Sequence, residues 1–148
     1  MAALDRQEAN PMNKVLVFAL LLAACDNSPL MTPGQDCQRC HSETGNAQRF
    51  SVSGTVFPSS ASISEHGLEG ATVLIVDAQN NQVSSPTNAA GNFYFFDDLQ
   101  FPVTVSVQIG STIRHMEPSV TNGGCNHCHS TPPKEGAEGR IFVHPDTP

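Results

Sequence analysis

The sequence predicts a mainly β protein, a sandwich of short strands flanked by two short cysteine-containing segments. In the middle of the chain, apolar residues alternate with polar ones over short runs, as they do on strands with one buried face. Gly and Pro, eleven of each, indicate many turns and few long helices. Several short strands at this spacing are typical of a β-sandwich.

The chain of 148 residues is long enough for one domain with appendages. Its net charge of −7, with only seven basic residues, argues against nucleic-acid binding and leaves no polybasic patch for a membrane. We expect five parts: an N-terminal extension and signal peptide (1–24), a tether (25–36), a first cysteine segment (37–49), the sandwich (50–116), and a second cysteine segment with a C-terminal strand (117–148).

The N-terminal part contains the pattern of a signal peptide. Lys14 precedes an apolar run at 15–24, about ten residues long, which is too short to span a bilayer. Leu22-Ala23-Ala24-Cys25 resembles the bacterial lipobox, in which the cysteine is lipid-modified and becomes the new N-terminus. That resemblance implies cleavage before Cys25 and a lipid anchor in a bacterial cell envelope, at the periplasmic face of the inner membrane or at the outer membrane. Met1 and Met12 are alternative starts, and a buried core helix is the alternative for the run.

Two C-x-x-C-H motifs are the most informative feature of the chain: Cys37-Gln38-Arg39-Cys40-His41 and Cys125-Asn126-His127-Cys128-His129. Two thiols three positions apart lie on one helical turn, where each can form a thioether with a vinyl group of one porphyrin. The next residue, histidine, can supply the proximal nitrogen to the iron. The pattern predicts two covalent haem c groups, with thioethers at Cys37, Cys40, Cys125 and Cys128 and with His41 and His129 as proximal ligands.

Other chemistries suit the same cysteines. Two C-x-x-C pairs can form a four-cysteine zinc site, an interpretation that leaves both motif histidines unexplained. The four can also form two short disulfides or a redox pair. If haem uses these four and lipid uses Cys25, none of the five cysteines remains for a structural disulfide.

The predicted strands follow one another at short intervals. We expect them at 50–56, 71–77, 82–84, 93–96, 101–109 and 111–116, with a final edge strand at 140–144. The first has one buried face, and the β-branched apolar run at 71–77 suits a central strand. The strand at 111–116 pairs with its predecessor across Gly110. Gly70 and Gly91 fall in tight turns that need positive φ.

Part of the sandwich resembles a known family. The glycine-containing stretches at 54–56, 67–73 and 87–95, together with 103–105, resemble the carboxypeptidase regulatory-like domain over roughly residues 50–109. The resemblance implies a small transthyretin-like, immunoglobulin-type sandwich and no peptidase activity. With its flanking C-x-x-C-H segments, the chain is also similar to small exported cytochromes of bacteria.

The sixth ligand of each iron is less evident from the sequence. Besides the proximal histidines, the candidates are His66, His115, His127, His144, Met31 and Met116. We expect His127 to point outward and His66 and His144 to be exposed. The adjacent His115 and Met116 precede the second motif closely enough to fold back over a haem, so we expect one of them to be a distal ligand. A methionine would raise the reduction potential relative to a second histidine.

These features predict a membrane-anchored dihaem electron carrier and not an enzyme. Filled sixth positions leave no site for a substrate, and we expect no deep pocket in the sandwich. The acidic composition favours basic redox partner proteins. We expect the haems to be neighbours if the two ends of the sandwich lie close together. The alternatives are a haem enzyme or gas sensor with one open iron, and a surface binding module stapled by zinc.

Overall fold

The computed structural model describes residues 28, 30–62 and 66–143. The predicted signal peptide, the alternative starts, the lipidation site Cys25 and the candidate ligand His144 lie outside the described residues. Within the part of the chain that is described, no helix is long and apolar enough to cross a membrane.

The described residues form seven strands and two single-turn helices. The strands are β1 (Val52–Phe57), β2 (Thr72–Val76), β3 (Gln82–Pro86), β4 (Asn92–Phe95), β5 (Thr104–Ile109), β6 (Thr112–His115) and β7 (Ile141–Phe142). The helical turns are η2 (Cys37–Arg39) and α1 (Cys125–Cys128), one in each C-x-x-C-H motif. The chain is therefore mainly β, as the sequence predicts.

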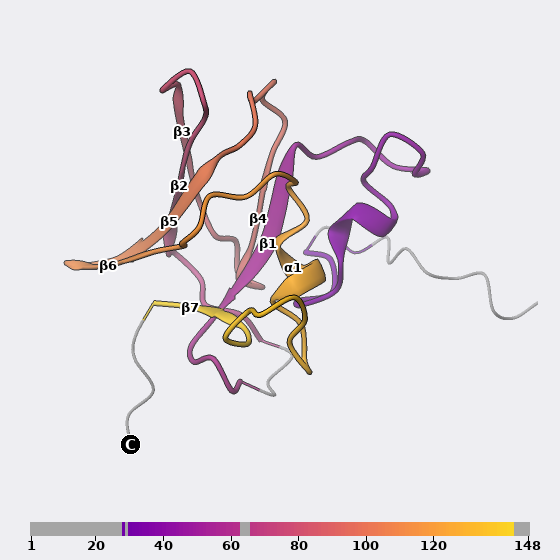
Figure 1. The fold of residues 1–148 in the computed structure, drawn as a ribbon. Coiled ribbons are helices and arrows are strands. Elements are labelled where there is room, and N and C mark those ends of the chain that lie inside the picture. The colour runs from indigo at the N-terminus through magenta and orange to yellow at the C-terminus, as the bar shows by residue number, and fades with distance from the viewer. Residues whose placement is uncertain (1–27, 29, 63–65, 144–148) are drawn as a thin grey trace, which may run out of the picture.

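The strands form two sheets that pack face to face. One sheet has the order β4-β1-β7 and the other has the order β3-β2-β5-β6 (Figure 1). All pairings are antiparallel except that of β1 with β7, which is parallel. The predicted central strand is confirmed, because β2 lies between β3 and β5. The predicted hairpin across Gly110 is confirmed as β5 and β6.

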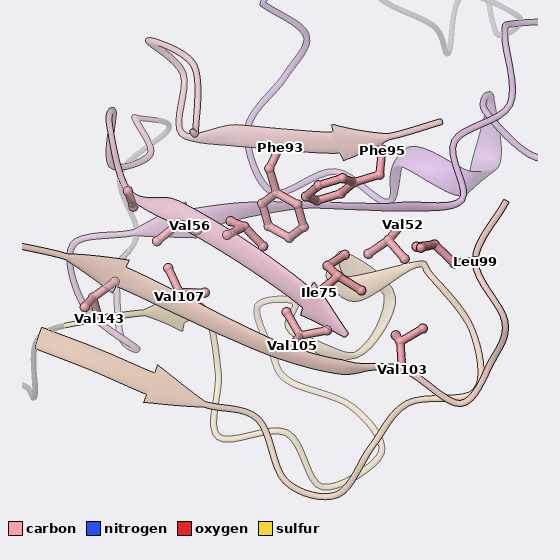
Figure 2. Close-up of a cluster of buried hydrophobic side chains, with 12 residues drawn as sticks. Val52, Val56, Ile75, Phe93, Phe95, Leu99, Val103, Val105, Val107 and Val143 are labelled. Carbon is pink, nitrogen blue, oxygen red and sulfur yellow. The ribbon is translucent and has the colours of Figure 1, made fainter. Parts of the chain in front are cut away.

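The core lies between the two sheets. Figure 2 shows Phe93 and Phe95 of β4 projecting into the layer that also contains Ile75 of β2 and Val105 of β5. Fully burying a large apolar side chain contributes about 1.5–3 kcal/mol, so this layer supplies most of the stabilisation of the sandwich. Gly70 and Gly91 have φ of +76° and +75°, which confirms the predicted turns.

The prediction that the first strand has one buried face is wrong, because every residue of β1 is buried. Val52 and Val56 face the core as expected. Ser53 and Thr55, on the alternate face, are covered by segments from outside the sandwich. The period-two pattern shows which face is apolar, but it does not show what covers the polar face.

Candidate functional site

Each C-x-x-C-H motif folds as a single helical turn that ends at its histidine. The amide of His41 donates to the carbonyl of Cys37 (2.9 Å), and the amide of His129 donates to the carbonyl of Cys125 (3.0 Å). Asp36 caps the first turn, because its side chain accepts from the Gln38 amide at 3.1 Å. In both motifs the turn brings the two cysteines and the histidine to one short stretch of backbone.

The two motif histidines make the same hydrogen bond. His41 Nδ1 lies 2.7 Å from the carbonyl oxygen of Gln48, and His129 Nδ1 lies 2.8 Å from that of Gly139. A carbonyl oxygen only accepts, so each Nδ1 carries the proton and each Nε2 has a free lone pair. Histidines that ligate metals are commonly held in this way, with the other ring nitrogen donating to a backbone carbonyl.

Aromatic rings hold the first of these histidines. The His41 ring stacks on Phe50 with centroids 3.8 Å apart, and Phe50 stacks in turn on Tyr94 at 4.7 Å. The Phe50 amide also donates to the His41 carbonyl at 2.9 Å. Stacking and hydrogen bonding together restrict the rotation of this imidazole.

The two motifs lie side by side, although they come from opposite ends of the sandwich sequence (Figure 1). Asp36, which caps the first motif, accepts at Oδ2 from His127 Nδ1 at 3.2 Å. His127 Nε2 lies 3.5 Å from Glu135, so this exposed ring lies between two carboxylates. Asn126 Nδ2 donates to the Gln35 carbonyl at 2.8 Å.

Asn126 fixes the second motif to the sheet. It is 2% exposed; its Oδ1 accepts from the Thr55 amide (3.0 Å), and its Nδ2 donates to Thr55 Oγ1 (3.0 Å). Neither variable position of a C-x-x-C-H motif is required by haem chemistry, so the sequence carried no signal that this residue is buried. The polar residues Ser53 and Thr55, opposite it on β1, were the only indication of such a contact.

The free thiols of the site have raised pKa values. Burial raises the pKa of Cys125 to about 12, and the neighbouring Cys37 and Cys128 add to the effect. Burial is also the largest cause of the raised pKa of Cys37 and of Cys128. In all three cases burial disfavours the charged thiolate relative to the neutral thiol.

Cys40 is disulfide-bonded in this structure. This differs from the expectation that no cysteine remains for a structural disulfide. A thioether at Cys40 needs a free thiol, so haem attachment at the first motif requires that this disulfide be reduced.

A cavity of about 660 Å³ lies beside the second motif. Its lining includes the motif residues Cys125, Cys128 and His129, and the apolar core residues Phe93 and Val105. Residues of β4, β5, β6 and β7 line the cavity together with the second motif. The volume lies within the usual range of small-molecule sites, roughly 300–1,000 Å³.

Both distal candidates next to the second motif line this cavity, but they lie on different faces of the sheet. The Met116 amide donates to the carbonyl of Val105, an inward-facing residue of β5 (2.9 Å). His115 pairs with Ser106, on the other face of β5. Directly paired residues share a face, so Met116 projects toward the core and His115 projects away from it. Met116 packs against the core cluster, as Cys125 does, whereas His115 is exposed.

The residues of the second motif suit a covalently held porphyrin. They combine two free thiols on one turn and an imidazole with its Nε2 free. The adjoining cavity is lined by apolar side chains and by Met116, whose thioether sulfur can ligate iron. A zinc site would need the four thiols to meet at one point. Among the residues that the structure describes, no group of three or more His, Cys, Asp or Glu side chains is arranged to hold a metal ion.

No protein-family model, curated protein or solved structure matches this chain.

Proposed function

We propose that the protein is a dihaem c-type cytochrome that transfers electrons between redox partners in a bacterial cell envelope. One observation carries the proposal: both C-x-x-C-H histidines hold Nδ1 against a backbone carbonyl, which leaves Nε2 for iron. A haem bound there would supply a ferric–ferrous couple. In this proposal the protein supplies the proximal ligands His41 and His129 and the thioethers from Cys37, Cys40, Cys125 and Cys128.

The site supports an electron carrier better than an enzyme. Met116 faces the cavity beside the second motif. Its thioether sulfur can fill the sixth position of the iron and favour the ferrous state. We therefore assign Met116, and not His115, as the distal ligand of the second haem. The contacts between the two motifs suit passage of an electron from one haem to the other.

The first test is the haem content of the full chain, produced in a periplasm with c-type maturation machinery and extracted in detergent. We expect two covalent haems per chain, sharp c-type bands on reduction and no response of the second haem to carbon monoxide. Replacement of His129 by alanine should alter one haem, whereas replacement of His127, whose ring nitrogens face carboxylates, should alter neither. A colourless protein that contains zinc would overturn the proposal, and two carbon-monoxide-responsive haems would indicate an enzyme or gas sensor.

The distal assignment has its own matched pair of variants. Met116→Leu should remove the sulfur-to-iron charge-transfer band of the ferric protein, lower the potential of one haem and allow that haem to bind carbon monoxide. His115→Ala should leave all three properties unchanged, because the side chain lies on the opposite face of the sheet. The reverse result would assign His115 instead.

We further propose a lipid anchor at Cys25, because Leu22-Ala23-Ala24-Cys25 resembles a lipobox. An acylated N-terminal cysteine would hold both haems near a membrane surface. Cys25→Ser should move the haem-containing protein from the membrane fraction to the soluble fraction. The net charge of −7 favours basic redox partner proteins through an attraction that salt weakens. We also propose that the sandwich is of the carboxypeptidase regulatory-like, transthyretin-like type, as the glycine-containing stretches indicate.

A further inference from the structure

The cavity beside the second motif is lined by two arginines with different surroundings. Arg114 lies 3.3 Å from Glu138, and its guanidinium carbon lies 3.8 Å above the centre of the Phe142 ring. Arg140 lies 4.2 Å above the Phe57 ring and donates from Nε to the Ser62 carbonyl at 3.3 Å. Among the described residues, no carboxylate pairs with Arg140.

The environment of Arg140 leaves its charge poorly solvated. The side chain packs against Gly34, where the room for its guanidinium exists only because glycine has no Cβ. Burial lowers the pKa of this guanidinium, although arginine stays protonated at any physiological pH. A partly buried cation gains stability when an anion approaches it.

Arg140 is also tied to the proximal histidine of the second motif. It directly follows Gly139, whose carbonyl accepts from His129 Nδ1. Its amide donates to the Ser60 carbonyl at 3.0 Å, and β7 begins at the next residue. One short, anchored segment therefore orients the imidazole and contributes Arg140 to the lining of the same cavity.

We infer that Arg140 binds a propionate of the porphyrin attached at the second motif. The inference rests on the proposed function. Thioether formation uses the vinyl groups and leaves both propionates ionised, and the planar guanidinium matches a carboxylate in geometry. Arg114 is paired with Glu138, whereas no carboxylate of the described residues pairs with Arg140, the other arginine of this cavity.

The test compares the midpoint potentials of both haems in the full, haem-loaded chain. Arg140→Gln should lower the potential of the second haem and shift its propionate-bending band in resonance Raman spectra, because a positive charge beside the porphyrin favours the ferrous state. Arg140→Lys should give a smaller shift in the same direction. Arg49→Gln, which removes an exposed arginine paired with Glu43, should leave the second haem unchanged.

The outcomes separate the inference from the proposed function. A wild-type chain without haem would overturn both. Two haems in the wild type, with an unchanged potential and propionate band in Arg140→Gln, would overturn the inference alone. If Arg140→Gln does not fold, Arg140→Lys decides by the same two readouts: unchanged values overturn the inference, and a shift of the second haem alone supports it.

Discussion

At the scale of single residues, a small buried polar network joins three parts of the chain. Thr55 Oγ1 donates to Asn92 Oδ1 (2.6 Å) and accepts from the Gly34 amide (2.9 Å), while Asn126 binds both Thr55 and Gln35. Among the described residues, no buried side-chain nitrogen or oxygen lacks a hydrogen-bond partner. A network that is fully satisfied in this way specifies one arrangement of its members, so the position of the second motif depends on it.

Asn126→Ala should destabilise the protein by about 1–3 kcal/mol, because the buried Thr55 amide would lose its acceptor and the Gln35 carbonyl would lose its donor. Denaturant unfolding monitored by far-UV circular dichroism measures this loss. Asn126→Asp keeps the acceptor and loses both donated bonds, so it should also destabilise. Gln79→Ala, at an exposed turn position, is the control and should change little. An Asn126→Ala variant as stable as the wild type would show that the motif does not need this anchor.

The carboxyl group of Asp77 makes the stability of the protein depend on pH. Burial alone would raise the pKa of Asp77, but hydrogen bonds from Asn81, Gln100 and Gln79 outweigh it and hold this pKa below its ordinary value. Because the folded pKa is lowered, the unfolded chain binds this proton more readily than the folded chain does. The contribution of Asp77 to the free energy of unfolding is therefore complete above about pH 5, and it is lost as the pH falls through the folded pKa. Asp77→Asn should make the loss of stability at acid pH less steep, as measured by denaturant unfolding at a series of pH values. An unchanged acid limb in Asp77→Asn would contradict this reading.

At the scale of elements, the second motif completes a sheet edge. The Ser53 amide donates to the Gly123 carbonyl (2.8 Å), and the next outward-facing amide, that of Thr55, donates to the Asn126 side chain. β7 pairs with Val56 and Phe57, at the end of β1. The stretch from Gly123 to Asn126 thus takes the place of a strand along the rest of β1, and it satisfies backbone groups that an open edge would expose.

Gly123→Ala should displace the second motif from β1, because a Cβ there would lie 1.7 Å from the Ser51 carbonyl oxygen, and backbone cannot yield as a side chain can. We expect a destabilisation of about 1–3 kcal/mol, typical of overpacking. Gly124→Ala is the matched control, since its Cβ would meet side-chain atoms and no backbone, the nearest being Gln38 Cγ at 3.0 Å. Thermal unfolding of the two variants measures the difference, and equal stabilities would contradict the close approach.

At the scale of the whole molecule, the sandwich brings the two ends of its sequence to one strand. The first motif reaches β1 through Gln38, which donates to the Phe50 carbonyl (3.2 Å) and to Ser53 Oγ (3.4 Å). The second motif reaches it through Asn126. If both motifs bind haem as proposed, the two haems would be neighbours, and the charge state of one would influence the other.

Cys125→Ala together with Cys128→Ala should remove one covalent haem and leave the sandwich folded, because the contacts that anchor α1 come from Asn126 and the backbone and not from the thiols. The remaining haem should change its midpoint potential, since it loses a charged neighbour. Circular dichroism and a redox titration measure the two effects. An unchanged potential would mean that the haems do not interact, and loss of both haems would mean that the motifs are not independent attachment sites.

The sequence by itself determined the mainly β class, the positions of the strands, the turns at Gly70 and Gly91 and the two motifs, because alternation, turn residues and motif spacing are local properties. Only the tertiary structure decided that both faces of β1 are covered, that Asn126 anchors the second motif and that a cavity adjoins it. It also distinguished Met116 from His115, which are adjacent in sequence but face opposite sides of β6. These features depend on contacts between residues far apart in the chain, and such contacts leave no periodic signal in either partner.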